Sequence, residues 1–209
     1  MARKKIIYTK LYPYHITGRT NNKENFILEQ EIVWEVFISK LDDLKNIYNF
    51  DIKAFVLMSN HYHLLVSTPD ENISAGMAYF HSQVAKEINL QSGRINHLFG
   101  DRYKWSIIAN EKYYWNVVKY IYRNPIKAGI CKKVEDYQFS SLSSNKSLFK
   151  MTDYFFDNSK PINLELEWLN HAFSREEDQA ITKGLKKKEF KIARNQSGFA
   201  VNVAPLRKK

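Results

Sequence analysis

The sequence of 209 residues is poor in cysteine, and its only one is Cys131. A single cysteine excludes a disulfide framework within the chain and a zinc site made of several cysteines. This low content is typical of proteins in a reducing compartment. The N-terminus has no apolar run of signal-peptide length. No window approaches the roughly 18 consecutive apolar residues of a membrane helix. We therefore expect a cytoplasmic protein without a membrane span.

Acidic residues are also outnumbered, with 22 Asp and Glu against 32 Lys and Arg, which gives a net charge of +10. A positive balance of this size favours an anionic partner, and nucleic acid is the commonest one for a basic domain. The alternative is a surface that is basic without any such partner. Hydrophobic residues make up 44% of the chain, enough for a sizeable core.

Along the first two thirds of the chain, apolar and β-favouring residues follow strand spacing in some segments and helix spacing in others. Strands are predicted at residues 6–18, interrupted near Pro13, and at 51–58, 61–67 and 103–109. Helices are predicted at residues 27–47, 73–90 and 111–123, the last ended by Pro125. This order predicts an α+β fold, the ferredoxin-like or RRM-like βαββαβ antiparallel sheet with helices on one face.

The character of the sequence changes near residue 145, so we predict a domain over residues 1–145 and a C-terminal helical extension over residues 146–209. Helices are predicted at 164–173 and 175–190, the second opened by a capping box from Ser174 to Glu177. Residues 181–209 carry nine Lys and Arg against one acidic residue. We interpret them as a basic, partly disordered arm; the alternative is a solvated tail without a partner.

Two histidines, His61 and His63, interrupt a run that is otherwise typical of a buried strand. Residues two apart on a strand point to the same face, with Cα atoms about 6.5 to 7 Å apart. Tyr62 therefore points the other way, into the core. Two imidazoles on one face can share a metal ion. The alternative is a pair of hydrogen-bonded surface histidines.

A second pair, Tyr120 and Asn124, lies one helical turn apart, so both side chains share a helix face. The amide oxygen of Asn suits Mg²⁺ or Mn²⁺, and the phenol of Tyr is a nucleophile once activated. Tyr122 points elsewhere and is assigned to a core stripe. The alternative for Tyr120 is a packing role, because the chain has 13 tyrosines.

His61-Tyr62-His63 resembles the His-hydrophobic-His ("HUH") signature, and the helix Y-I-Y-R-N-P-I-K-A-G, from residue 120, resembles the catalytic-tyrosine helix of the single-tyrosine HUH transposases. Residues 13–22 and 101–105 are also similar to family segments in the same order. The chain is most similar to the REP-associated tyrosine transposases over about residues 5–145. Related single-tyrosine transposases have Gln at the position of Asn124, and Asn fits the REP-associated group better.

The resemblance implies a metal-dependent endonuclease and strand transferase that cleaves and rejoins single-stranded DNA at hairpin-flanked sites. It makes His61, His63 and Asn124 ligands of Mg²⁺ or Mn²⁺. It makes Tyr120 the nucleophile that forms a covalent 5′-phosphotyrosine. The metal is expected on the exposed face of the sheet. Related transposases include monomers and homodimers, so both states stay open here.

Contacts with DNA are expected where aromatic rings alternate with basic residues, since bases stack on rings while Lys and Arg meet phosphates. The candidates are Arg19, Arg102, Tyr103, Lys104, Trp105, Lys112, Arg123 and Lys127. The alternative is that the aromatics belong to the core and the charges are solvated. His15 lies in a segment similar to the family and is a weaker candidate; His81, His97 and His171 belong to no motif.

Other functions fit part of this pattern. A replication initiator or relaxase-like nickase shares the histidine pair but places its tyrosine in other surroundings. A non-catalytic RRM-like module that binds single-stranded nucleic acid would need exposed sheet aromatics and no metal ligands. An inactive or host-adopted relative of the transposases would keep the motif. Metal binding by His61 and His63 discriminates the nuclease from the binding module.

Overall fold

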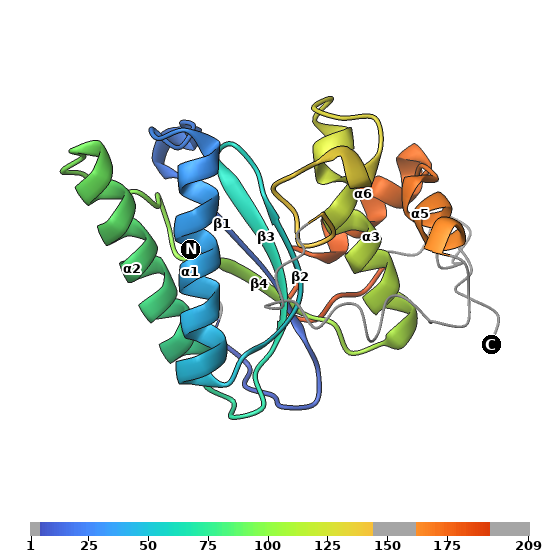
Figure 1. Cartoon of the computed structure of the whole chain (residues 1–209). Helices are drawn as coiled ribbons and strands as arrows, with labels where there is room; N and C mark the ends of the chain where they lie inside the picture. Colours follow the sequence, from blue (N-terminus) through green and yellow to red (C-terminus); the bar gives the residue numbers. More distant parts are fainter. Residues whose placement is uncertain (1–4, 144–161, 193–209) are drawn as a thin grey trace.

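A computed structural model describes residues 5–143 and 162–192 (Figure 1). Four antiparallel strands form one sheet in the order β2-β3-β1-β4. The strands are β1 (Tyr14–Arg19), β2 (Asp51–Leu57), β3 (His61–Ser67) and β4 (Lys104–Ile107). The helices are α1 (Gln30–Tyr48), α2 (Ile73–Ser92), α3 (Glu111–Lys127), α5 (Ile162–Asn170) and α6 (Arg175–Gly184), with short 3-10 turns η1 (Asn21–Lys23) and η2 (Val134–Asp136). The predicted α+β fold is confirmed.

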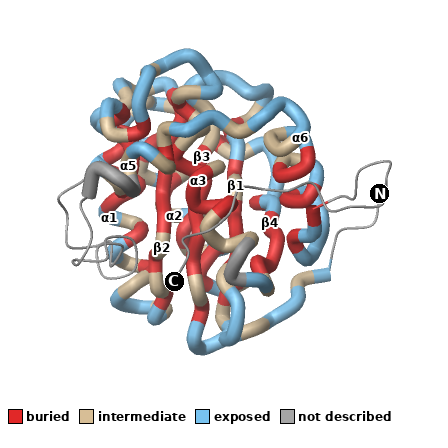
Figure 2. Tube along the Cα trace, turned by 90° about the vertical axis from the view of Figure 1, so that its right-hand side faces the viewer, coloured by how far each residue is buried: buried red, intermediate tan, exposed pale blue. Residues whose placement is uncertain are grey.

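The two helices of the βαββαβ unit, α1 and α2, lie together on one face of the sheet, as expected (Figure 1). Phe37 of α1 packs its ring 5.5 Å from that of Tyr62 on β3, and Gly76 of α2 leaves room for the ring of Phe50. Buried residues follow the strands and the inward sides of the helices (Figure 2). Tyr62 thus points into this core, as its place between two histidines predicts.

Helix α3 lies on the opposite face of the sheet, together with α5 and α6 (Figure 1). The face that was expected to be exposed is therefore partly covered. The register places Arg19 opposite His61 and Thr17 opposite His63. Directly opposed residues in an antiparallel pair point to the same side, so alternate residues of β1 and β3 face α3.

Pro125 does not end α3, contrary to the prediction. A proline has no N–H to donate to the carbonyl four residues earlier, which here belongs to Ile121. The side chain of Asn124 supplies donors instead: its Nδ2 lies 2.8 Å from the Tyr120 carbonyl oxygen and 3.3 Å from that of Ile121. The helix consequently continues to Lys127.

The first predicted strand is also shorter than expected, because only Tyr14–Arg19 pairs in the sheet. Residues 6–13 precede it without strand structure. Pro13 lies at the start of the ladder, where its missing N–H is tolerated. Tyr14 holds the preceding segment by donating its hydroxyl to the Ile7 carbonyl.

The described part of the C-terminal extension packs on α3 and β4. The capping box is confirmed: Glu177 N–H donates to Ser174 Oγ, and Ser174 N–H donates to the Glu177 carboxylate. Helix α6 ends at Gly184 rather than near 190, and the chain then pairs with β4, where Phe190 N–H donates to the Ile107 carbonyl. Residues 181–192 are therefore ordered. The rest of the predicted arm, 193–209, and the predicted boundary near 145 lie outside the described residues.

No helix in the described ranges is long and apolar enough to cross a membrane.

Candidate active site

Residues from β1, β3 and α3 meet where α3 crosses the sheet. The rings of His61 and His63 lie 5.2 Å apart at 80°. The ring of Tyr120 stands nearly perpendicular to His63, with centroids 5.7 Å apart. The structure thus brings together the His-X-His pair and the tyrosine, which are far apart in the sequence.

The two histidines are uncharged at neutral pH because they are withdrawn from water. Burial lowers the pKa of His61 to about 4, with a smaller contribution from the nearby positive charge of Arg19. Burial also lowers the pKa of His63 well below its ordinary value, and His15, His61, Arg19 and Lys127 add to that shift. The neutral imidazole is the form that binds a metal ion.

His15 also lies at this site, although the sequence made it only a weaker candidate for contact with DNA. Its side chain is 3% exposed, which does not fit direct contact with DNA. Its Nε2 lies 3.0 Å from Nδ1 of His63, and the two rings stack at 25°. The available signal was strand alternation: His15 and Arg19 lie four apart on one strand, so they share a face.

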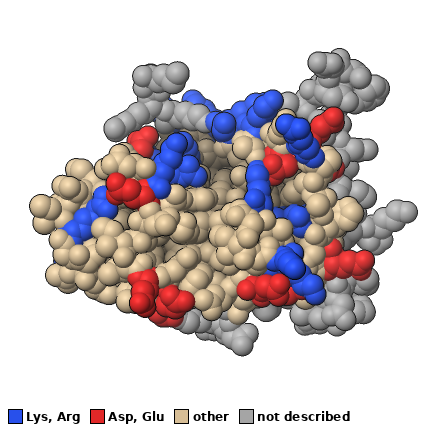
Figure 3. All heavy atoms as spheres, turned by 90° about the horizontal axis from the view of Figure 1, so that it is seen from above, with Lys and Arg blue, Asp and Glu red and all other residues tan. Residues whose placement is uncertain are grey.

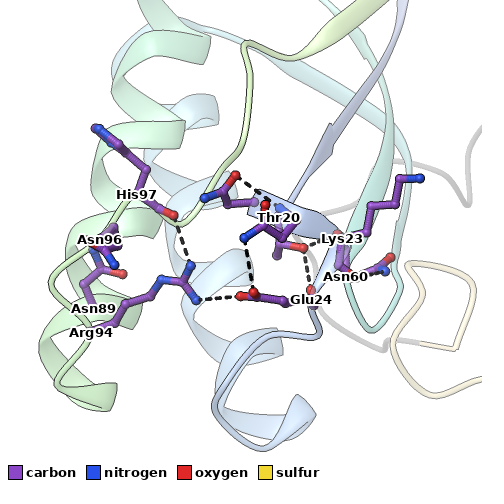
Figure 4. A network of polar contacts seen from close by, with 10 residues as sticks. Thr20, Lys23, Glu24, Asn60, Asn89, Arg94, Asn96 and His97 are labelled. Carbon is purple, nitrogen blue, oxygen red and sulfur yellow. Dashed lines mark hydrogen bonds and ion pairs between the residues drawn. The ribbon is translucent and has the colours of Figure 1, made fainter.

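Asn60 makes the corresponding contact with the other histidine. Its Oδ1 lies 2.7 Å from Nδ1 of His61, and its Nδ2 donates to the Lys23 carbonyl over 2.8 Å. Figure 4 shows Asn60 beside Lys23, next to a network in which Arg94 reaches Glu24. Each predicted histidine ligand therefore has a polar partner on its Nδ1.

Tyr120 is partly buried under α6. Burial raises the pKa of its phenol; the ammonium group of Lys127 opposes that shift, as does the Thr182 hydroxyl, whereas the Asp178 carboxylate adds to it. Lys127 Nζ lies 5.8 Å from the centre of the Tyr120 ring and 2.6 Å from a carboxylate oxygen of Asp178. The charge that favours the phenolate is thus shared with α6.

Asn124 turns its amide nitrogen back to its own helix, which leaves Oδ1 as the atom able to accept or to ligate. An amide oxygen is a ligand type that suits Mg²⁺ or Mn²⁺, and neutral imidazoles bind divalent transition metals such as Zn²⁺ and Fe²⁺. Within the part of the chain that the structure describes, no three His, Cys, Asp or Glu residues are grouped to hold a metal. The predicted third ligand, Asn124, is an amide and does not belong to these residue types.

The side of the molecule seen in Figure 3 is hollowed in the middle, with Lys and Arg side chains around the hollow. Among the predicted DNA contacts, Arg19, Lys104 and Lys127 are exposed. Thr17 is opposite both His63 and Lys104 in the sheet register, so Lys104 belongs to the α3 side. These three basic residues are placed where a phosphate backbone could approach the site.

Two of the predicted contacts are core residues instead. Tyr103 is 5% and Trp105 is 6% exposed, and Trp105 meets the ring of Tyr14 edge-on. Trp105 in β4 and Tyr103 just before it both turn their rings toward the α2 side, so no base can stack on them. Arg102 is exposed and lies 5.0 Å from the Tyr103 ring centre.

The two remaining candidates differ in how they are placed. Arg123 donates to the Leu169 and Asn170 carbonyls at the end of α5, a packing contact that ties the extension to α3. The side chain of Lys112 lies outside the described part of the structure.

The chain belongs to the family described as transposase IS200 like, whose model matches residues 8–124. A putative REP-associated tyrosine transposase of Haemophilus influenzae is 30% identical over 105 residues, which cover 45% of this chain and 60% of that relative. The match therefore spans less than two thirds of the Haemophilus protein. The REP-associated tyrosine transposase of Escherichia coli is 25% identical over 143 residues, 68% of this chain and 82% of the relative.

The fold agrees with these relatives. A solved structure of a REP-associated tyrosine transposase bound to a REP hairpin superposes with a TM-score of 0.60. The superposition covers 78% of this chain and 96% of the chain of the solved structure, at 23% sequence identity. Together with the family match and the two sequence relatives, this likeness of fold confirms the resemblance to REP-associated tyrosine transposases.

Proposed function

We propose that this transposase cleaves and rejoins single-stranded DNA through Tyr120, with His61, His63 and Asn124 holding a divalent metal ion. The observation that carries the proposal is the contact between the rings of Tyr120 and His63, 5.7 Å apart. It joins a potential nucleophile on α3 to a potential metal ligand on β3. This contact is expected of an active site, and neither α3 nor β3 depends on it to form.

The chemistry follows from the groups present. The Tyr120 phenolate oxygen attacks phosphorus while the bond from phosphorus to the 3′-oxygen breaks. The proton given up by the phenol is balanced by the one that the leaving 3′-hydroxyl takes up. The product is a 5′-phosphotyrosine, which a 3′-hydroxyl can attack later to rejoin strands without ATP. When bound, the ion would polarise the scissile phosphate and offset developing negative charge.

The protein's own charges complete the site. Lys127 lies beside the Tyr120 ring, where a positive charge favours the phenolate. The exposed Arg19 and Lys104 are suited to hold the phosphates of a bound strand. We propose hairpin-flanked DNA as the substrate, supported by the similarity to a transposase whose structure contains a REP hairpin.

A non-catalytic RRM-like module is the alternative function, and it requires aromatic rings exposed on the sheet. Tyr103 and Trp105 are buried, and the face that carries the histidines is crossed by α3. These observations favour the nuclease.

The proposal is tested by incubating the protein with 5′- and 3′-labelled hairpin DNA and Mn²⁺, and separating the products on a denaturing gel. We expect a covalent adduct with the wild type and none with Tyr120→Phe. Tyr113→Phe, on the same helix, is the matched control and should keep the adduct. An adduct that persists in Tyr120→Phe would mean that another residue is the nucleophile.

A further inference from the structure

The amide of Asn60 has only one orientation that satisfies its neighbours. Its Nδ2 donates to the Lys23 carbonyl, which accepts and cannot donate. Its Oδ1 must then be the atom that faces Nδ1 of His61. Because an amide oxygen only accepts, Nδ1 of His61 carries the hydrogen. In a neutral imidazole this leaves the lone pair on Nε2.

The position of Asn60 is itself fixed by the neighbouring turn. The Thr20 N–H donates to the Asn60 carbonyl over 3.0 Å, so backbone and side chain are both tied to residues 20–23. Arg94 holds the same turn by pairing with Glu24 and donating to the His97 carbonyl. The acceptor facing His61 is therefore a built feature of the fold. Figure 4 shows Asn60 at this turn beside Lys23.

His15 is the Nδ1 partner of the second histidine, His63. Between neutral rings, the contact of His15 Nε2 with His63 Nδ1 contains one hydrogen, carried by one of the two atoms. If it lies on His63 Nδ1, then Nε2 of His63 has the lone pair. If it lies on His15, Nε2 of His63 carries a hydrogen and is unable to bind a metal. His15 is buried, and no step of the proposed reaction uses it.

We propose that His15 and Asn60 are positioning residues, which hold His63 and His61 in the Nδ1–H form so that both present the lone pair of Nε2 to one metal ion. Partners of this kind fix the tautomer and the ring orientation of metal-binding histidines. The inference rests on the proposed function for the ion, but the tautomers are a property of the metal-free protein.

The first test needs neither metal nor DNA. Two-bond ¹H–¹⁵N correlation spectra of the full chain distinguish the two tautomers of each histidine. We expect His61 and His63 as Nδ1–H in the wild type. His15→Leu removes the acceptor and should shift His63 toward the Nε2–H form while His61 stays unchanged; Asn60→Ala should do the reverse.

The second test is Mn²⁺ affinity, measured with the metal alone by electron paramagnetic resonance. We expect His15→Leu and Asn60→Ala to bind Mn²⁺ about 10- to 100-fold more weakly. His15→Gln, which keeps an acceptor near the position of Nε2, should recover most of this loss. His81→Leu is the matched control, because His81 is a half-buried histidine whose ring contacts the Tyr62 hydroxyl on the α2 side of the sheet. It should leave Mn²⁺ affinity unchanged.

Circular dichroism establishes that each variant is folded. If His15→Leu does not fold, Asn60→Ala keeps the inference testable, because Asn60 lies in a hairpin turn and keeps its backbone contact with Thr20. An Nε2–H form of His61 or His63 in the wild type would overturn the inference. So would wild-type Mn²⁺ affinity in both His15→Leu and Asn60→Ala. A wild type with the expected tautomers but no Mn²⁺ binding would instead refute the proposed function and leave the tautomer assignment standing.

Discussion

Lys127 shows how one residue sets the chemistry of another. Its ammonium group lies near the Tyr120 ring and opposes the rise in pKa that burial imposes on the phenol. The same group is paired with Asp178 of α6. The pKa of the Tyr120 phenol thus depends on a residue about two turns along its own helix, and that residue is paired with a carboxylate of the C-terminal extension.

Replacing Lys127 by Met removes this charge, so the pKa of Tyr120 rises further. We expect covalent adduct formation at pH 7 to slow about 10-fold, since one pKa unit changes the phenolate fraction tenfold. The pH profile of the rate should move to higher pH. Lys86→Met, on the distant α2, is the control. An unchanged profile in Lys127→Met would contradict this role of the lysine, and a separate affinity measurement would show whether it contributes to DNA binding instead.

Two buried aromatic rings show, also at the scale of residues, where a sequence pattern gave the wrong prediction. Tyr103 and Trp105 alternate with basic residues, a pattern typical of nucleic-acid surfaces. The structure turns both into the core, because β4 and the residue before it pack on their α2-facing side. Composition along a strand does not reveal which face the protein buries.

At the scale of elements, α3 depends on the Asn124-Pro125 pair. We expect Asn124→Ala to lower the free energy of unfolding by about 1 kcal/mol, because the Tyr120 and Ile121 carbonyls lose a donor. In a Pro125→Ala background, the new N–H can bond Ile121, so the same substitution should cost less. Urea unfolding of the four proteins measures the coupling; strictly additive effects would contradict this role of Asn124.

The C-terminal extension is joined to the sheet at β4. Phe190 is 1% exposed, packs edge-on against Tyr113 and pairs through its backbone with Ile107. We expect Phe190→Ala to lower the free energy of unfolding by about 3 to 5 kcal/mol. Ile95→Ala, at a side chain that is 95% exposed, should change it by less than about 0.5 kcal/mol. Similar small values for both would show that residues 188–192 contribute little to the fold.

At the scale of the whole molecule, the buried histidines make stability depend on pH. Burial lowers the pKa of His15 to about 3, and of His61 and His81 to about 4. The unfolded chain binds protons near pH 6.5 and the folded one does not, so stability is full above pH 6.5 and is lost as pH falls toward 4. Each group should cost about 1 to 2 kcal/mol at pH 5.

Urea midpoints followed by tryptophan fluorescence between pH 7.5 and about 4.5 test this expectation. His81→Leu, outside the site, should flatten the dependence by its own share. A midpoint that is constant across this range would contradict the burial of neutral histidines.

The sequence by itself determined what local periodicity can encode. Strand alternation placed His61 and His63 on one face with Tyr62 in the core, and helix spacing put Tyr120 beside Asn124. The order of strands and helices predicted the sheet. The observed elements differ from the predicted ones mainly at their ends. There the side-chain hydrogen bonds of Asn124 and the missing N–H of Pro13 act, and periodicity describes neither.

Only the tertiary structure decided that these residues meet. The contacts of Tyr120 with His63, of His15 with His63, and of Lys127 with α6 join segments that are distant along the chain. Such contacts arise because β1, β3, α3 and α6 must all bury apolar surface against one another. Local spacing contains no information about which buried faces come together. The places of His15 and of the C-terminal extension at the site were therefore visible only in the tertiary structure.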